Sequence, residues 1–356
     1  MTESSANLDS PFIADADEAV ARRPDIWESL RGARVFVSGG TGFLGSWLIA
    51  LCARANRRYN LDISVTAAAR DERRLARAMD LFAADLTLDV LPIDLGSITT
   101  IAGTYSHVLH AAATVHASSG EASADEYARM IAGVENMLRL ARRTGARFLL
   151  LSSGAIYGHV SSRNAGCVDE DTPRSALEGP WKAYAEAKRI SEDVCQQEPQ
   201  VHTTIARIFS CAGYGMALGQ YAIGNFIADA LEDRPIRVRN ERVVRTYLHA
   251  ADTAEWLWAM CATGHAHAIY NVGGNEPITM RGLAMLVAES ASRVNHAKAG
   301  IVFDDIGGAS GIADRYVPCV DRARKDLGLT VATPLSQTVD RCVTAVARFT
   351  YGRICP

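Results

Sequence analysis

Short apolar runs alternate with longer helical segments between residues 34 and 209 of this 356-residue chain. Each run has four to seven residues rich in aliphatic or β-branched side chains, which is typical of strands buried on both faces of a parallel sheet. The runs are Val35–Ser38, Ile63–Ala68, Val90–Ile93, Val108–Ala111, Phe148–Ser152 and Thr203–Phe209. Strands that alternate with helices in this way predict an α/β fold built on a doubly wound parallel sheet.

The clearest helical pattern covers Ser123–Arg143. Ser123 and Glu126 have the spacing of a capping box, apolar residues follow at intervals of three or four, and Gly145 stands just past the end. We therefore expect one amphipathic helix here.

A glycine-rich turn directly follows the first run, and a helical segment follows the turn. The turn reads Gly39-Gly40-Thr41-Gly42-Phe43-Leu44-Gly45. Glycine tolerates positive φ and lets the backbone approach a pyrophosphate closely, and the free N–H groups at a helix start favour negative charge. The succession of strand, turn and helix predicts a Rossmann-like dinucleotide-binding site.

Beyond Phe209 the alternation gives way to glycine-rich loops and isolated helical segments, which predicts a second, smaller lobe. In an open α/β sheet the ligand lies beyond the carboxyl ends of the strands, so this lobe would close over that edge. We expect a polar N-terminal extension over residues 1–28, a Rossmann domain over 29–209 and about 243–275, and a mixed α/β substrate-binding lobe over about 210–242 and 276–356.

Composition narrows the class of ligand. Charged residues are 22% of the chain and the formal net charge is -3, so a general nucleic-acid surface is not indicated. No apolar stretch reaches the roughly 18 residues that a membrane helix needs, and the start of the chain lacks a signal-peptide pattern. The eight cysteines are spread singly, and no metal-ligand spacing occurs. We expect a cytoplasmic protein that acts on small molecules without a metal.

The second strand ends in Ala67-Ala68-Ala69-Arg70-Asp71, where NAD enzymes usually place a carboxylate for the adenosine ribose. An arginine at this point can pair with a 2′-phosphate, and Arg73 and Arg74 add positive charge, although all three can also be solvated on a loop. We favour NADP over NAD as the cofactor. Asp94, after the third strand, either accepts from the adenine amino group or caps a helix.

Tyr184 and Lys188 are four residues apart and therefore share one face of a helix. The ammonium can then lower the pKa of the phenol and hold the nicotinamide ribose while the phenol transfers a proton. About thirty residues earlier a strand ends in Ser152 and Ser153, and a serine leaving the sheet there can bind a substrate oxygen. The structural alternatives are a strand-end turn for the serines and a packing role for the tyrosine.

The glycine turn, the Ser153 strand and the Tyr184-x-x-x-Lys188 pair, in this order, resemble the extended short-chain dehydrogenases of the nucleotide-sugar epimerase and dehydratase family. The resemblance runs from about residue 33 to the C-terminus. Further matches are His110-Ala111-Ala112, Arg207-Ile-Phe-Ser-Cys-Ala-Gly-Tyr-Gly, Arg245-Thr-Tyr-Leu-His-Ala-Ala-Asp252 and Tyr270-Asn271-Val272-Gly273.

The resemblance implies the role of each residue. Ser153 would bind the reacting oxygen, Tyr184 act as general acid and base, and Lys188 bind ribose. The cofactor-binding residues would be Gly39, Thr41, Gly42, Phe43, Leu44, Gly45, Arg70, Asp94, Leu95, Ala111, Ala112, Tyr184 and Lys188. The substrate-binding residues would be Ser153, Ser210, Asn225, Arg245 and Arg315. Arg245 would clamp the diphosphate of a nucleotide sugar. Family members typically dimerise through two helices, which here would be residues 123–143 and 184–195.

Departures from the family pattern narrow the reaction. Dehydratases of this family carry an acidic residue directly after the catalytic hydroxyl, to eliminate water, whereas this chain has Gly154 and Ala155. Ser210 stands where many members have asparagine. The favoured hypothesis is an epimerase that oxidises and re-reduces C4 of a nucleotide-diphosphate sugar.

Other reactions stay open. The first alternative is an NADPH-dependent ketoreductase of a 4-keto-deoxysugar nucleotide, or of a small ketone as in the dihydroflavonol reductases, whose second strand also ends in an Arg-Asp pair. A 4,6-dehydratase is less favoured. A non-catalytic NAD(P)-binding regulator is also less favoured, because Ser153, Tyr184 and Lys188 are all present.

Overall fold

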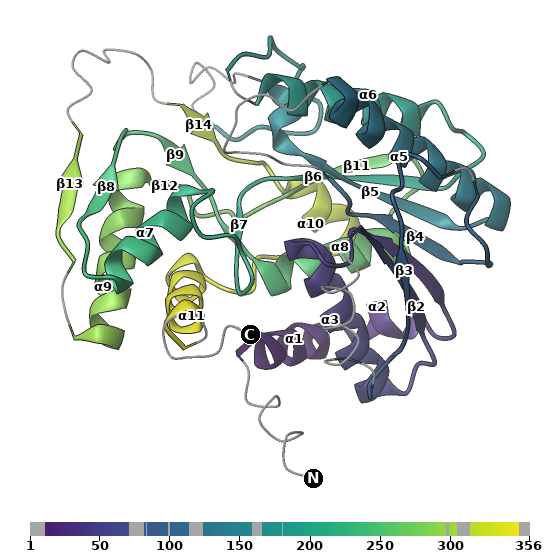
Figure 1. Cartoon of the computed structure of the whole chain (residues 1–356), viewed down its shortest axis with the longest axis horizontal. Coiled ribbons are helices and arrows are strands. Elements are labelled where there is room, and N and C mark those ends of the chain that lie inside the picture. Colours follow the sequence, from purple (N-terminus) through teal and green to yellow (C-terminus); the bar gives the residue numbers. More distant parts are fainter. Residues whose placement is uncertain are drawn as a thin grey trace.

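A seven-stranded sheet forms the centre of the larger part of the molecule (Figure 1). Its strands are β1 (Arg34–Ser38), β2 (Ser64–Ala69), β3 (Thr87–Pro92), β4 (His107–His110), β5 (Arg147–Ser153), β6 (Thr203–Ile208) and β11 (Ala268–Val272). They lie in the order β11-β6-β5-β4-β1-β2-β3, and every neighbouring pair is parallel. The computed structural model describes residues 11–70, 82, 84–98, 100–113, 124–158, 166–179, 181–296, 299–304 and 314–348.

This architecture confirms the predicted doubly wound α/β fold. All six predicted strands are present, with ends within three residues of those predicted, and β11 adds a seventh at the edge beside β6. The strand order reverses between β1 and β4, which are neighbours in the sheet but are separated in the chain by β2 and β3. A crevice beyond the carboxyl ends of the strands at such a reversal is where open α/β sheets bind their ligands.

Helices cover both faces of the sheet (Figure 1). On one face lie α5 (Ala124–Thr144) and α6 (Lys182–Gln196), and on the other lie α3 (Phe43–Tyr59) and α8 (Ala250–Thr263). Because successive strand residues point to opposite faces, Phe36 packs toward the α5 side whereas Val35 and Val37 pack toward the α3 side. The predicted amphipathic helix is present as α5, and the capping serine proposed for it, Ser123, lies outside the described residues.

The N-terminal segment differs from the polar extension that we expected. Residues 11–28 form α1 (Pro11–Arg22) and α2 (Pro24–Glu28), and α1 is amphipathic. Its buried face, Phe12, Ile13, Ala16, Ala19 and Val20, belongs to the same core as α3 and α8. The apolar residues of α1 occur in short groups between acidic residues, so the sequence did not indicate an amphipathic helix here. The helix is therefore part of the folded core.

A smaller lobe, formed by segments before and after β11, lies at the side of the sheet in Figure 1. The helices α7 (Ala222–Leu231), α9 (Met280–Asn295) and α11 (Leu335–Val346) pack together around their own apolar core. Short strands complete the lobe: β7 (Cys211–Ala212) pairs with β10 (Leu248–His249), β8 (Ile236–Val238) with β13 (Ile301–Phe303), and β9 (Val244–Arg245) with β12 (Ile278–Thr279) and β14 (Arg315–Tyr316). A 3-10 turn, η1 (Gly154–Tyr157), follows β5, and α10 (Asp321–Leu327) packs on β11.

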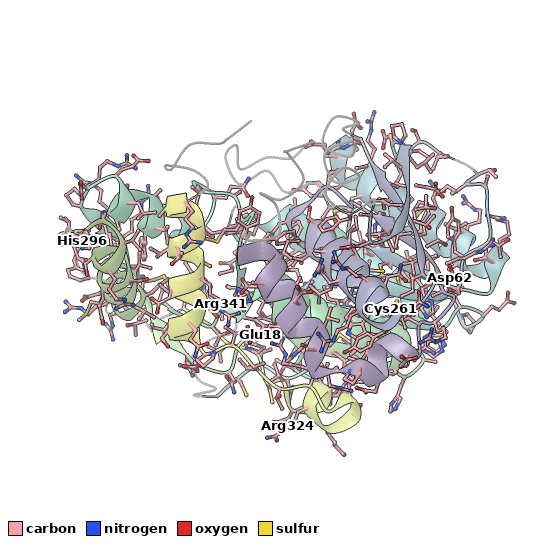
Figure 2. The ribbon with its side chains drawn as sticks, turned by 90° about the horizontal axis from the view of Figure 1, so that it is seen from below. Glu18, Asp62, Cys261, His296, Arg324 and Arg341 are labelled. Carbon is pink, nitrogen blue, oxygen red and sulfur yellow. The ribbon has the colours of Figure 1, made fainter. Side chains whose placement is uncertain are left out.

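The helix α1 joins the two parts. It packs against α3 and α8 of the larger part and against α11 of the lobe. In Figure 2, Glu18 on α1 and Arg341 on α11 lie close together, and Arg341 donates to Glu18 at 2.8 Å and to Asp15 at 2.8 Å. The position of the lobe beside the sheet is thus tied to the N-terminal helix.

Candidate active site

The three predicted catalytic residues lie at the carboxyl end of β5 and on the first turns of α6. Ser153 is the last residue of β5, and it is close enough to Tyr184 on α6 to lower the pKa of that phenol. Ser153 also accepts the N–H of Ala155 at 3.2 Å, which caps the 3-10 turn η1. The fold thus brings together two side chains that are thirty-one positions apart in the sequence.

Burial governs the ionisation of this pair. Burial raises the pKa of Tyr184 to about 12, and the hydrogen bond from Ser153 only partly offsets the effect. Burial also lowers the pKa of Lys188 to about 8, opposed by the negative charge of Glu192. The Lys188 ammonium donates to the carbonyl of Leu151 at 2.7 Å and lies 5.9 Å from the centre of the Tyr184 ring.

The net shift of the Tyr184 pKa is therefore upward, opposite to the lowering that we expected from Lys188. The reason is geometric: the ammonium is directed to the end of β5, and Lys188 is not among the groups that stabilise the phenolate. Spacing along a helix correctly placed both residues on one face, but it did not determine where the long lysine side chain would find a partner.

A buried ionic network supports this corner of the site. Glu192, one turn beyond Lys188 on α6, is fully buried, and it accepts from Ser152 at 2.5 Å and from Arg207 at 2.8 Å. Arg207 also donates to the Tyr157 hydroxyl at 2.9 Å. Because every charged group in the network has a hydrogen-bonded partner, the end of β5, the turn η1 and helix α6 are held in one arrangement.

The glycine turn begins where β1 ends. Gly39 has φ +70°, and a Cβ on it would lie 2.7 Å from the N of Ala112 after β4. A Cβ on Gly45 would lie 2.1 Å from the carbonyl of Gly39, so the turn and the start of α3 can close only with glycine at these positions. No side chain caps α3 at Gly42, which leaves its first N–H groups available to an anion. These features fit the pyrophosphate of a dinucleotide.

The remaining predicted cofactor residues line the same edge of the sheet. Thr41, Phe43 and Leu44 are half-buried around the start of α3, and Ala111 and Ala112 follow β4. Ala111 donates its N–H to the carbonyl of Ser38, the residue that precedes the glycine turn. The edge that would face a dinucleotide is therefore built from the ends of two adjacent strands.

Two predicted cofactor positions have structural roles of their own. Asp94 accepts the N–H of Gly96 at 3.0 Å and pairs with Arg129 at 3.2 Å, so it holds the turn at residues 95–97, which does not begin a helix. The carbonyl of Leu95, a buried residue, accepts from Asn136 at 2.7 Å. Arg70 is exposed directly after β2, where we expected it, whereas Arg73 and Arg74 lie outside the described residues.

The smaller lobe supplies the predicted substrate residues. Arg245 donates to Asp314 at 2.5 Å, and Arg315 donates to the carbonyl of Gly166 at 3.1 Å. Asn225 is exposed on α7, and Ser210 is half-buried between β6 and β7. Both arginines are only partly buried, so their present partners can be exchanged for the oxygens of a phosphate.

One residue of the site was not predicted. Tyr316, on β14, is half-buried, and its hydroxyl lies beside Gly154, where a Cβ would stand 2.6 Å from it. It pairs in register with Arg245 on β9, whose guanidinium lies 5.6 Å from the centre of the Tyr316 ring. No pattern in the sequence indicated this contact, because it depends on how the three-stranded sheet of the lobe lies against β5.

Among the described residues, no helix combines the length and the apolarity needed to cross a membrane. Within those same ranges, histidine, cysteine and acidic side chains form no group of three or more that could hold a metal ion.

Comparison with known proteins places this geometry in a family. The model of the "NAD dependent epimerase/dehydratase family" matches residues 35–273. A curated relative, UDP-glucuronic acid decarboxylase 2 of Arabidopsis thaliana, is 29% identical over 266 residues, which are 73% of this chain and 57% of that protein. The chain spans only a little over half the length of this relative and of several other such decarboxylases.

Solved structures of low sequence identity share the fold. An epimerase from Methanothermobacter thermautotrophicus has a TM-score of 0.73 at 18% identity, covering 92% of this chain and 96% of that one. A variant UDP-glucuronic acid 4-epimerase from Bacillus cereus, in complex with NAD and a fluorinated UDP-glucuronic acid, has a TM-score of 0.71 at 16% identity, covering 88% and 99%. The family model covers most of the chain, and we conclude that this protein belongs to the NAD-dependent epimerase/dehydratase family.

Proposed function

We propose that the chain is an NAD(P)-dependent epimerase that oxidises and re-reduces C4 of a nucleotide-diphosphate sugar. The observation that carries this proposal is the place of the Lys188 ammonium between the end of β5, where Ser153 stands, and Tyr184. It donates to the carbonyl of Leu151 at 2.7 Å and lies 5.9 Å from the centre of the Tyr184 ring. Both hydroxyls lie at the edge of the sheet to which the glycine turn belongs, so a sugar oxygen bound to Ser153 would be within reach of Tyr184.

The residues have distinct tasks in this reaction. A bound nicotinamide cofactor supplies the acceptor and the donor of hydride. Tyr184 takes the proton of the sugar hydroxyl as the carbon is oxidised, and it returns the proton when the carbon is reduced on the other face. Ser153 holds the sugar oxygen, and Lys188 contributes positive charge and a donor for the ribose. The reaction has no net redox change.

The space around Gly154 disfavours dehydration. A Cβ at this position would lie 2.6 Å from the Tyr316 hydroxyl and 2.7 Å from the ring of Phe209. A carboxylate therefore cannot stand directly after Ser153 unless an aromatic ring moves away. Elimination of water needs an acid to protonate the leaving hydroxyl, and the chain has Gly154 and Ala155 at the two positions that would supply it.

For the cofactor, we propose that Arg70 favours NADP through a guanidinium contact with the 2′-phosphate. Its exposed position directly after β2 supports this. NAD is the alternative, and several structures of the same fold were solved with NAD. Titrating the protein with NADP and with NAD separately distinguishes the two, and tighter binding of NAD would overturn the preference.

Two other reactions have a specific observation in their favour. The curated relatives are UDP-glucuronic acid decarboxylases, which favours loss of carbon dioxide from a sugar acid as the second candidate. Arg70 favours an NADPH-dependent ketoreductase, since NADPH is the usual reductant of such enzymes. All three reactions use the same proton carrier, Tyr184, and they differ in what happens after the carbon is oxidised or reduced.

The test is product analysis with defined substrates. The purified protein would be incubated separately with UDP-glucose, UDP-glucuronic acid and dTDP-glucose, and the products would be examined by mass spectrometry and NMR. Epimerisation leaves the mass unchanged and inverts one sugar carbon. We expect this result for the wild-type protein, and we expect Tyr184→Phe to abolish it. A product lighter by carbon dioxide or water, or stoichiometric consumption of NADPH with a keto-sugar, would overturn the epimerase assignment.

We also propose a homodimer formed through α5 and α6. These helices pack side by side on one face of the sheet, and α6 leaves Ile190 44% exposed. Light scattering coupled to size-exclusion chromatography tests this, and a single monomeric species would overturn it.

A further inference from the structure

One tryptophan differs from the others in its exposure and in its neighbour. The fifth tryptophan of the chain, Trp181, is 37% exposed. The four others are fully buried: Trp27, Trp47, Trp256 and Trp258. Single exposed apolar side chains are common on protein surfaces, so exposure alone carries no argument. The neighbour does, because the Trp181 indole contacts the ring of Tyr184, with ring centres 6.1 Å apart.

Trp181 belongs to the face of α6 that presents the proposed catalytic pair. It directly precedes the helix, and its carbonyl accepts the N–H of Ala185 at 2.9 Å, so it already follows the helical hydrogen-bond pattern. Trp181, Tyr184 and Lys188 are spaced by three and four residues, which places them on one side of a helix. The indole therefore continues this face by one turn, toward the start of α6.

The place of Tyr184 determines which part of a nucleotide sugar meets Trp181. In the proposed reaction Tyr184 exchanges a proton with the oxygen on C4, so the sugar ring lies against the Tyr184 hydroxyl. The nucleobase is separated from C4 by the sugar ring, two phosphates and a ribose, and Arg245, the residue proposed for the diphosphate, belongs to β9 of the lobe. An aromatic ring in contact with Tyr184 is therefore within reach of the sugar and remote from the base.

The indole has the chemistry that a sugar ring needs on one of its faces. A hexose carries its hydroxyls around the rim, and the C–H groups on the faces of its ring form apolar patches. A tryptophan offers a wide, rigid apolar surface together with one N–H that can donate to a hydroxyl. The planes of the indole and the phenol meet at 75°, so the two rings form a corner with the proton carrier on one side and an apolar wall on the other.

We propose that Trp181 is a sugar-binding residue, whose indole packs on the apolar face of the hexose that reacts at Tyr184. The proposal rests on the proposed function, because it takes the sugar to be the group on which Tyr184 acts. A free nucleotide ends at its diphosphate and does not reach the indole. Trp181 therefore helps the site to distinguish a nucleotide sugar from the nucleotide alone.

A purely structural role of Trp181 predicts a different result. An indole that only supports the Tyr184 ring would, when removed, disturb the position of the phenol and lower turnover, and the affinities for UDP-glucose and for UDP would stay unchanged. An indole that contacts the sugar contributes to the affinity for the nucleotide sugar and not to the affinity for UDP. The ratio of the two affinities therefore separates the two roles.

The first measurement uses the fluorescence of the indole. Acrylamide, a neutral quencher, reaches exposed tryptophans far more readily than buried ones, so most of the quenchable emission should come from Trp181 and be missing in Trp181→Phe. We expect saturating UDP-glucose, UDP-glucuronic acid or dTDP-glucose to protect Trp181 from acrylamide, and UDP, NAD or NADP alone to leave it accessible.

Three outcomes of the quenching experiment would overturn the proposal. The first is that none of the three nucleotide sugars protects Trp181. The second is that UDP or a dinucleotide protects it equally well, since the indole would then contact a group other than the sugar. The third is that acrylamide does not reach Trp181 even without ligand, since the indole would then be covered by another part of the protein.

The second measurement is calorimetric titration with UDP and with the nucleotide sugar that protects best. Trp181→Ala should weaken binding of the nucleotide sugar about 10-fold and leave UDP binding unchanged, as expected for the loss of one aromatic packing contact. Trp181→Phe keeps part of the apolar surface and should weaken the same binding about 3-fold. An unchanged affinity for the nucleotide sugar in Trp181→Ala would overturn the proposal.

Lys182→Ala is the matched control. Lys182 is the next residue along the chain, it is exposed, and its ammonium lies 3.9 Å from the carboxylate of Glu186 on the same helix. The variant should bind UDP and the nucleotide sugar as the wild-type protein does. An equal loss of nucleotide-sugar affinity in Lys182→Ala and Trp181→Ala would show a general disturbance of the start of α6 and would overturn the proposal.

The sugar-binding role and the epimerase assignment fail in different ways. Protection of Trp181 by a nucleotide sugar that the protein binds but does not epimerise would reject the epimerase and retain the sugar-binding residue. Epimerisation of a nucleotide sugar that leaves Trp181 accessible to acrylamide would reject the sugar-binding residue and retain the epimerase.

Discussion

The large sheet and the smaller lobe contribute to the site in different ways. The sheet side presents Ser153, Tyr184 and Lys188, backed by Glu192, a carboxylate with no exposed surface and several hydrogen-bonded partners. The lobe side presents Arg245 and Arg315, which are partly exposed and hold one carboxylate and a few backbone carbonyls between them.

This difference matches what the proposed function requires of each side. Proton transfer needs groups whose positions do not change, and a buried network with every charge paired resists rearrangement, since breaking it leaves a charge without a partner. Recognition of a diphosphate needs cations that can exchange partners, and a partly solvated ion pair costs little to open. The sheet side therefore holds side chains whose positions are fixed, and the lobe side holds cations whose partners can be exchanged. Each of the following predictions tests one side of this contrast.

The largest effect should come from the buried network. Glu192→Ala leaves Arg207 buried at the end of β6 without its carboxylate partner, so the free energy of unfolding should fall by about 3 to 5 kcal/mol. Asp193→Ala is the matched control, because Asp193 is exposed and shares the Arg174 guanidinium with Glu192. Its loss should cost less than about 1 kcal/mol. Denaturant unfolding measures both free energies. Equal losses of stability in the two variants would contradict the expected difference between the buried and the exposed carboxylate.

The next effect concerns chemistry alone. Tyr184→Phe should lower turnover by on the order of 10²-fold or more, because the proton carrier is lost while the ring still packs 6.1 Å from Trp181. Affinities for the dinucleotide and for the nucleotide sugar should stay within a few-fold of the wild type. Steady-state kinetics and calorimetric titration separate these quantities. A variant that keeps its turnover would refute the assignment of the sheet side as the catalytic one.

The contact between the two parts should respond to pH through Asp15 on α1. Burial raises the pKa of Asp15 to about 6 from 3.8, although Arg341 opposes the shift, and Glu18, His249 and Asp252 lie nearby. The folded chain therefore holds this proton more tightly than the unfolded chain, so its contribution to stability is complete below about pH 4 and is lost as pH rises through about 6.

The variant Asp15→Asn should remove this loss of stability at rising pH, which is on the order of 2 kcal/mol between acidic and neutral pH. Asp17→Asn is the control, since Asp17 is a half-buried residue of the same helix that pairs with Arg54 on α3, and its variant should keep the loss of stability. Thermal unfolding over a series of pH values gives both results. Parallel curves for Asp15→Asn and the wild type would show that Asp15 does not titrate in this range.

The smallest effect should appear on the lobe side. Arg245→Ala should weaken binding of UDP about 10-fold, because one charge-assisted contact is lost, and it should leave dinucleotide binding unchanged. Arg315→Ala should have a smaller effect, because the Arg315 guanidinium donates to the carbonyl of Gly166 and has no carboxylate partner that a phosphate would replace. Calorimetric titration with UDP tests both. Equal losses of UDP and dinucleotide affinity would count against a separate substrate side.

Local patterns predicted the sheet side well. The six apolar runs, the glycine turn and the pair Tyr184 and Lys188 all appear where the sequence placed them, because each depends on strand length, turn geometry or helical spacing. The pKa of Tyr184 was predicted in the wrong direction, because it depends on burial and on the partner that Lys188 finds in space. The N-terminal helix was missed because its apolar residues are few and gain their partners only from α3, α8 and α11.

The sequence by itself determined the sheet, the glycine turn and the pair of residues proposed as catalytic, since these follow from contacts between residues close in the chain and from repeated patterns. Only the tertiary structure decided that the Tyr316 hydroxyl lies beside Gly154, that Glu192 backs Lys188, and that α1 joins the lobe to the sheet. The physical reason is that burial, ion pairing and steric exclusion act between side chains brought together from distant segments, and no local pattern encodes which segments meet.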